Sequence, residues 1–262
     1  MPAIRLYVYN DNTPCRTSVL LFPGQAIWFA SDRDAMESAV SRIIALASVK
    51  GGAGKTTVTE ALVCKLASEC RIAVIDADPE LFYTKWSEKF FSPTATYTLY
   101  TETNEAALAH LIFKVAGECD LLLLDTPGAA NRAASIAMTA ADLVIVPVKT
   151  SEGDVSGAQR TVELVSGLAK AARREIPARV LINNFKAGTD VWAHAISEME
   201  RAGLPLLTSR LHNRVAYEEL SWSGQLPPPK SPAGREIAGL VGELREAGFI
   251  PAATLGRSRL AV

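Results

Sequence analysis

From residue 41 onward, short apolar runs alternate with longer segments of helical periodicity. Runs rich in Val, Ile and Leu are typical of parallel strands that are buried on both faces. The predicted strands span residues 43–48, 72–76, 97–100, 121–125, 143–147, 180–183 and 206–209. The predicted helices span residues 55–68, 105–116, 130–140, 153–173, 191–201, 215–223 and 234–247. This pattern predicts an α/β fold, with a mostly parallel, twisted sheet of about seven to eight strands covered by helices on both faces.

The same pattern divides the chain into an extension (residues 1–40), one domain (41–250) and a tail (251–262). Residues 4–9 are predicted to form a short strand. Residues 18–30 are rather apolar, but Pro23-Gly24-Gln25 interrupts them and no basic segment precedes them, which disfavours a signal peptide. Met36 lies just ahead of the first predicted core strand. Two interpretations of the first 35 residues therefore stay open: a genuine extension, or an upstream stretch outside the natural product.

The composition is that of a globular protein, with 48% hydrophobic and 21% charged residues. The formal net charge of -1 gives no indication of a globally basic nucleic-acid binder, although net charge does not say where charges gather. No apolar run approaches the roughly 20 residues that span a bilayer, so we expect no membrane segment and a cytoplasmic location. The four cysteines form no Cys-x-x-Cys pair and are expected to be reduced thiols.

A glycine-rich segment, Gly51-Gly52-Ala53-Gly54-Lys55-Thr56-Thr57, lies between the first core strand and the first helix. Glycines let successive backbone N–H groups turn towards phosphate oxygens, and the start of a helix adds further free donors. In this setting Lys55 is expected to contact the β- and γ-phosphates, and Thr56 to offer its hydroxyl to Mg²⁺. The segment therefore predicts a phosphate loop that binds ATP with Mg²⁺.

A second polar feature is Asp125, which ends the run Leu121-Leu122-Leu123-Leu124. A buried strand that presents a carboxylate at its C-terminal tip, beside a phosphate loop, can hold Mg²⁺ through the water shell of the ion. Asp-Thr-Pro-Gly also favours a turn, which is the alternative role of Asp125. Together with the phosphate loop, the metal role is the better prediction.

Three motifs occur together: Lys50 directly ahead of the glycines, Val74-Ile75-Asp76-Ala77-Asp78-Pro79 at the end of the second strand, and Asp125-Thr126-Pro127-Gly128. Together they resemble the deviant Walker A ATPases of the ParA/MinD group, and ParA-type partition proteins in particular. Residues 142–147, and residues 214–217 followed by Gly224, are similar to later segments of that family. The resemblance covers about residues 41–250 and implies a P-loop ATPase with slow, partner-stimulated hydrolysis.

The resemblance also implies a homodimer that holds ATP between two face-to-face subunits, with Lys50 reaching the phosphates of the partner. A cation delivered in trans is the device of an arginine finger, which typically accelerates hydrolysis by about 10³–10⁵. By the same resemblance, Asp76 helps to organise the Mg²⁺ shell and Asp78 positions or activates the attacking water. The alternative is that one of these aspartates caps the following helix.

Two positions need separate treatment. Glu80-Leu81 follows Asp-Pro where many partition proteins have Gln-Gly, a variant closer to VirC-like relatives, and this leaves the switch geometry and the hydrolysis rate open. Asn183 matches a family asparagine that contacts adenine, and Asn184 is the fallback for that role. Either asparagine is also compatible with an ordinary turn.

The resemblance implies that the ATP state binds nonspecific DNA, and that a ParB-like or other cargo-adaptor protein stimulates hydrolysis. From residue 201 onward there are eight basic and five acidic residues, which permits DNA binding without locating it. The basic residues are Arg201, Arg210, Arg214, Lys230, Arg235, Arg245, Arg257 and Arg259. Residues 252–260 lack the bulky apolar face of a MinD-like membrane helix, so we expect no membrane partner.

The sequence leaves two alternatives to a partition or cargo-positioning switch. One is a VirC-like accessory ATPase of conjugative DNA transfer. The other is a metabolic P-loop ligase of the dethiobiotin-synthetase type, which would not need Lys50.

Overall fold

The computed structural model describes residues 5–10, 13–22, 25–28, 41–91, 96–128 and 131–253, the first three ranges by their backbone only. The chain forms two compact units, Met1–Val40 and Ser41–Val262. In the first unit, three strands pair antiparallel in the order β1 (Arg5–Asn10), β2 (Thr13–Phe22) and β3 (Gln25–Trp28). The strand predicted over residues 4–9 corresponds to β1. Strands β2 and β3 are missing from the sequence prediction, although they overlap the rather apolar residues 18–30.

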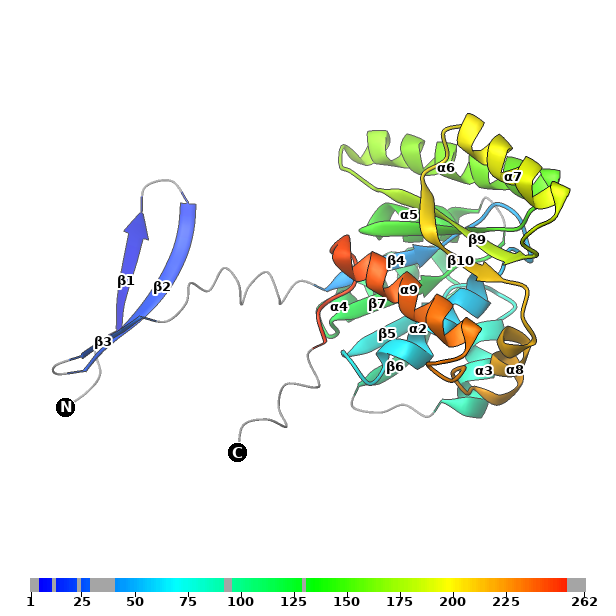
Figure 1. The fold of residues 1–262 in the computed structure, drawn as a ribbon. Coiled ribbons are helices and arrows are strands. Elements are labelled where there is room, and N and C mark those ends of the chain that lie inside the picture. The colour runs from blue at the N-terminus through cyan, green and yellow to red at the C-terminus, as the bar shows by residue number, and fades with distance from the viewer. Residues whose placement is uncertain are drawn as a thin grey trace. The chain divides into compact units, whose positions relative to one another are not determined.

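The second unit is built on a seven-stranded sheet, with the spatial order β10-β9-β8-β4-β7-β5-β6 (Figure 1). All of its neighbouring strands are parallel, as predicted. The strands are β4 (Arg42–Leu46), β5 (Ile72–Asp76), β6 (Tyr97–Thr101), β7 (Leu121–Asp125), β8 (Leu143–Val148), β9 (Ala178–Phe185) and β10 (Leu206–His212). The predicted bounds lie close to these, although β10 extends three residues beyond the predicted end at residue 209.

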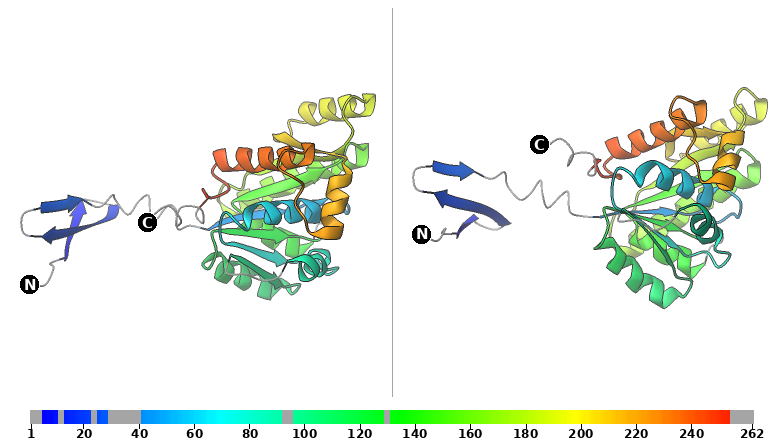
Figure 2. Two further views of the ribbon diagram at one scale, coloured as in Figure 1. Left: turned by 60° about the horizontal axis from the view of Figure 1, so that its bottom comes forward. Right: turned by 90° about the horizontal axis from the view of Figure 1, so that it is seen from below.

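Helices cover both faces of this sheet, as two turned views show (Figure 2). The helices are α2 (Lys55–Leu66), α3 (Phe82–Phe90), α4 (Glu105–Ala116), α5 (Arg132–Ala140), α6 (Glu152–Ala172), α7 (Asp190–Arg201), α8 (Val215–Ser223) and α9 (Pro232–Glu246). Strand β7 is an unbroken apolar run because both of its faces are buried. Leu121 and Leu123 pack in the core under α2, α3, α8 and α9, whereas Leu122 and Leu124 pack in the core under the helices α4 to α7.

One observed helix, α3, is missing from the sequence prediction. It has only nine residues, and its N-cap, Leu81, has a left-handed backbone (φ 51°) and makes no side-chain capping bond. The usual start signal is therefore absent from the sequence. A distant side chain replaces it, because Asp76 accepts a hydrogen bond from the backbone N–H of Thr84 at 2.9 Å.

The ends of the central strands lie in register at one edge of the sheet. Leu46, the last residue of β4, pairs with Asp125, and Asp125 pairs with Asp76 at the end of β5. The loop that follows β4 and the two aspartates are therefore brought together by strand pairing alone, at the edge where parallel α/β sheets bind ligands.

Helix α9 lies beside the edge strand β10. Glu243 accepts the backbone N–H groups of Thr208 and Ser209, each at 2.7 Å, and Glu236 accepts that of His212 at 3.2 Å. Two carboxylates thus take donors that a neighbouring strand would otherwise use. In the part of the chain that the structure describes, no helix is both long and apolar enough to cross a bilayer.

Candidate functional site

The glycine-rich segment forms a tight loop that enters α2. Gly52 and Gly54 have positive φ angles of 73° and 100°, which side chains rarely adopt. Gly54 is the N-cap of α2 and provides no side chain to cap the first turn. The first N–H groups of the helix are therefore available as donors beside the loop. A Cβ atom on Gly51 or Gly52 would meet no atom within 4 Å, so the loop borders open space.

A cavity of about 520 Å³ lies on this loop, and its lining includes Lys55, Thr56, Asp78 and Gly128. Lys55 is buried, and its ammonium group lies close to Gly128. A Cβ atom at that glycine would be 3.2 Å from Lys55 Nζ. Burial lowers the pKa of Lys55, and the Asp125 and Asp78 carboxylates oppose that shift. The cavity thus presents a cation, a hydroxyl and backbone donors to one volume, which suits a chain of phosphates.

Thr56 and Asp125 meet directly at the base of the loop. The Thr56 hydroxyl donates to Asp125 Oδ2 at 2.8 Å, while Oδ1 of the buried Asp125 has no hydrogen-bond partner. Burial, and next the charge of Asp76, raise the pKa of Asp125 to about 7. A hydroxyl and an unsatisfied carboxylate oxygen are the hard ligands that Mg²⁺ prefers, so these residues fit the ion with its water shell. No group of three or more His, Cys, Asp or Glu side chains suited to a metal occurs among the described residues.

The carboxylate of Asp76 is close to this pair but is already occupied. Its Oδ2 accepts from the backbone N–H and the hydroxyl of Thr84, and its Oδ1 accepts from the N–H of Asp78 at 3.1 Å. Asp76 therefore orders the segment that leads into α3, which corresponds to the capping alternative from the sequence. Asp78 lines the cavity and accepts the N–H of Glu80 at 3.0 Å. The two aspartates thus have different surroundings.

The Lys50 side chain forms an ion pair within its own chain and does not line the cavity on the phosphate loop. Its ammonium lies 2.6 Å from Asp154 Oδ1, near the start of α6, and its side chain is 41% exposed. Gly153 and Gly157 let the lysine approach α6, since a Cβ on Gly157 would lie 3.4 Å from Lys50 Cβ. Lys50 is therefore held by an intramolecular ion pair while its head remains accessible to solvent.

Asn183 lies against the phosphate loop. Its side-chain amide donates to the carbonyl of Ala53 at 3.0 Å and fills the place where a Cβ on Gly54 would sit. Together with Thr57 and Asn184, it also lines a second cavity of about 400 Å³ beside the loop, which includes Arg214 and Trp222. Asn184 has a left-handed backbone (φ 52°), and its side-chain oxygen accepts from Asn213. Contact with adenine stays a prediction for both asparagines.

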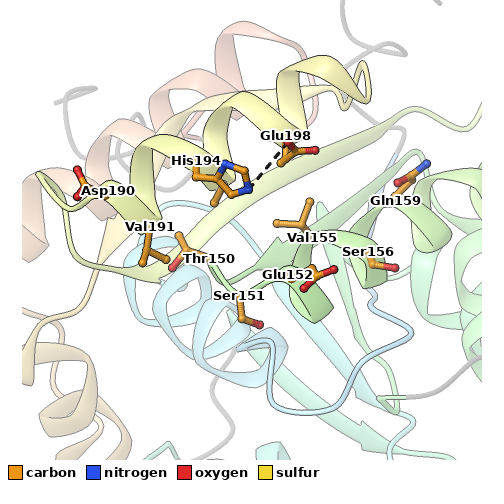
Figure 3. A pocket seen from close by; sticks show the side chains of 11 residues that line it. Thr150, Ser151, Glu152, Val155, Ser156, Gln159, Asp190, Val191, His194 and Glu198 are labelled. Atoms are coloured by element: carbon orange, nitrogen blue, oxygen red, sulfur yellow. Dashed lines mark ion pairs between the residues drawn. The ribbon is translucent and has the colours of Figure 1, made fainter.

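A larger cavity, of about 620 Å³, lies between α6 and α7, and its lining includes none of Lys55, Thr56 and Asn183 (Figure 3). Its lining includes Glu152, Val191, His194 and Glu198, and the imidazole of His194 points towards Glu198 at 4.0 Å. It has no glycine loop and no lysine. The chemistry therefore favours the smaller cavities on the phosphate loop over this larger one.

The structure adds two side chains to the site that the sequence did not single out. Glu60 lies one helical turn after Thr56 and is buried, with Oε2 unsatisfied. Its signal in the sequence was a single carboxylate among the apolar residues of α2. Asp154 is the ion partner of Lys50, and no local pattern links two residues so far apart in the chain.

Comparison with known proteins finds a family and individual relatives that are similar to this chain. A model of the VirC1 protein family matches residues 41–228. Protein virC1 of Rhizobium rhizogenes is 28% identical over 192 residues, which make up 71% of this chain and 82% of that protein. Protein ParA of Rhizobium radiobacter is 25% identical over 204 residues, 76% of this chain and 90% of that protein.

A solved structure, the ATP complex of a McdA variant from Cyanothece, has a TM-score of 0.67 at 17% identity and covers 80% of this chain and 98% of its own. This last likeness shows the fold alone. The family match shows more, because it spans well over half of the chain. The chain therefore belongs to the VirC1 family, within the ParA/MinD-type P-loop ATPases that its sequence motifs resemble.

Proposed function

We propose that this chain is an ATP-dependent dimerising switch of ParA type, which binds nonspecific DNA in its ATP state and acts in partition or in positioning a cargo. The observation that carries the proposal is the Thr56–Asp125 bond beside the glycine loop, with a buried oxygen of Asp125 left unsatisfied. This arrangement is suited to a nucleoside triphosphate with Mg²⁺, which would satisfy the unpaired oxygen of Asp125.

Each residue of the cavity has a role in the proposal. Lys55 and the N–H groups from Gly51 to Thr57 hold the phosphates. Thr56 and Asp125 hold Mg²⁺, which supplies positive charge to the phosphate oxygens when it is bound. Asp76 keeps the segment around Asp78 in place, so that Asp78 can orient a water at the rim of the cavity. Slow hydrolysis then times the switch.

Dimerisation is the second part of the proposal. Lys50 leaves Asp154 and reaches the phosphates held by a second copy of the chain, and this couples the nucleotide to the dimer. The exposed head of Lys50 supports this exchange, because an ion pair with one accessible partner contributes only about 0–1 kcal/mol.

The family match favours a second candidate, a VirC-like accessory ATPase of conjugative DNA transfer. It shares the nucleotide site and the DNA partner and differs in its cargo. A ParB-like or other adaptor protein that stimulates hydrolysis is expected for the partition role. The metabolic ligase gains no support from the family match, and Lys50 would have no use in it.

The nucleotide site is tested by titrating a fluorescent ATP analogue with and without Mg²⁺. We expect Lys55→Ala and Asp125→Asn to weaken Mg²⁺-dependent binding at least about tenfold, because each removes a charge that faces the phosphates or the ion. Glu152→Gln, an exposed change outside the phosphate-loop cavities, serves as the control. Equal affinity in all four proteins would refute the site.

The switch is tested by light scattering on the Asp78→Ala protein, in which ATP should persist. We expect dimers with ATP, monomers with ADP, and monomers in both cases once Lys50→Ala is added. A Lys50→Ala protein that still dimerises with ATP would count against the role of Lys50 in trans.

A further inference from the structure

Trp222, on the last turn of α8, is a large aromatic side chain that the fold leaves in solvent. It is 77% exposed, and it lies outside the sequence motifs described above. Single exposed aromatic residues are common on protein surfaces, so exposure alone assigns no role. Its position is more informative, because Trp222 lines the cavity of about 400 Å³ beside the phosphate loop, together with Asn183. The exposed indole therefore borders the proposed nucleotide site.

This second cavity adjoins the one that holds the phosphates in the proposed function. Gly52, Gly54 and Thr57 line both cavities, so both lie against the phosphate loop. Lys55 and Thr56, the side chains proposed to bind the triphosphate and Mg²⁺, line only the first. A nucleotide whose phosphates occupy the first cavity can therefore place its nucleoside in the second. A volume of about 400 Å³ is within the usual range of small-molecule sites.

The second cavity has three aromatic rings in its lining, and Trp222 is the most exposed of them. The other two are His212 and Tyr217. Tyr217 is buried, and its hydroxyl donates to Glu236 at 2.9 Å. The centre of the His212 ring lies 4.2 Å from that of Phe185, so this ring already has an aromatic neighbour. A planar base that enters the cavity therefore has the most aromatic surface to gain from Trp222.

Helix α8 is joined to α3 close to Trp222 (Figure 1). The Trp86 indole of α3 donates to the carbonyl of Leu220 at 3.2 Å, two residues before Trp222. The ammonium of Lys89, also on α3, lies 6.0 Å from the centre of the Trp222 ring, within the range of a cation–π contact. The indole is thus presented by an anchored helix, and a ligand that stacks on it has little ordering cost to overcome.

We propose that Trp222 stacks on the base of the bound nucleotide and makes the site select nucleotides over phosphate chains that carry no base. The inference rests on the proposed function and extends it from the triphosphate to the other end of the ligand. Stacking accepts any planar base, because every base has a π-face. Discrimination between bases therefore falls to hydrogen-bonding side chains of the same cavity, such as Asn183 and Asn184.

The test compares the affinities of two ligands, Mg²⁺–ATP and Mg²⁺–tripolyphosphate, by isothermal titration calorimetry. We expect Trp222→Ala to weaken the binding of ATP about 5–100-fold, the typical effect of losing one base–aromatic stack, and to leave that of tripolyphosphate unchanged. Trp222→Phe keeps a ring and should lose less affinity for ATP. Phe113→Ala is the matched control: it removes a 76% exposed ring from α4 that lines neither cavity, and it should bind both ligands as the wild type does.

Tryptophan fluorescence gives a second measurement, which reports on the indole itself. ATP should quench part of the emission of the wild type, and tripolyphosphate should not. At saturating ATP the quenched part should be missing from Trp222→Phe, because this variant binds the nucleotide without the stacked indole. A quenched part that persists in Trp222→Phe would contradict the stacking, whatever the affinities are.

The outcomes separate the role of Trp222 from the nucleotide site. A Trp222→Ala protein that binds ATP with wild-type affinity overturns the role of Trp222 and leaves the proposed function standing. An equal loss of affinity for ATP and tripolyphosphate also overturns it, because the side chain would then act on the phosphate cavity. A wild type that binds neither ligand overturns this inference and the proposed function together.

Discussion

Glu60 shows how a single buried acid can make stability depend on pH. Burial, and next the charge of Asp125, raise the pKa of Glu60 to about 8, against 4.5 ordinarily. The folded state therefore holds more protons than the unfolded state between these values, and stability falls as pH rises from about 4.5 to about 8. A shift of this size corresponds to at most about 5 kcal/mol.

Glu60→Gln removes that titration. We expect its melting temperature, measured without nucleotide, to exceed that of the wild type by a margin that grows from about pH 5 to about pH 8. Asp125 titrates in both proteins, and its coupling to Glu60 is part of the difference that is measured. A margin that stays constant with pH would show that Glu60 does not titrate in this range.

Removal of the Asp154 carboxylate should strengthen the proposed ATP-dependent dimer. In Asp154→Ala, Lys50 loses its intramolecular partner, so the ATP-dependent dimer should form about 2–5-fold more tightly, in keeping with a partly exposed ion pair. Sedimentation equilibrium of the Asp78→Ala background with ATP measures this. Glu152→Ala, which removes a neighbouring charge on α6, is the control and should leave the dimer unchanged.

At the residue scale, the sequence predicted the groups that act through local geometry. The phosphate loop lies between a strand and a helix, so the spacing of its glycines was enough to predict that Gly52, Gly54 and Lys55 belong to it. The pairing of Lys50 with Asp154 and the bond from Asn183 to Ala53 depend on how distant elements pack, and no local pattern encodes them. The roles assigned to these residues stay predictions.

At the scale of elements, a hydrogen bond and a close packing contact join α3 to α8 and the residue that follows it. The Trp86 indole donates to the carbonyl of Leu220 at 3.2 Å, and Gly224, just after α8, packs against Phe90. The strands of the large sheet were predictable because their apolar runs are continuous. Helix α3 was not, because a remote carboxylate replaces its cap.

Gly224→Ala tests that contact. The residue has a φ of 66°, and a Cβ there would lie 2.3 Å from Phe90 Cβ, so we expect a loss of about 1–3 kcal/mol in the free energy of unfolding. Urea denaturation measures it. Gly167→Ala, inside α6 with no atom near the added Cβ, should instead gain about 0.5–1 kcal/mol. Equal effects at the two glycines would contradict the packing argument.

At the scale of the whole molecule, the two hydrophobic cores found among the residues with described side chains belong to the unit Ser41–Val262. A protein that starts at Ser41 should therefore keep the melting temperature and the ATP affinity of the full chain. Differential scanning calorimetry and nucleotide titration check this side by side. A drop of more than about 5 °C would mean that residues 1–40 contribute to the stability of the larger unit.

The two carboxylates of α9 have one more consequence. Because Glu243 and Glu236 already accept amide groups of β10, that border of the sheet has few donors left to offer a strand from another molecule. Strand-by-strand growth into fibrils is thus disfavoured on this side. If copies of the chain polymerise by extending the seven-stranded sheet, we expect them to do so from β6, at its opposite border.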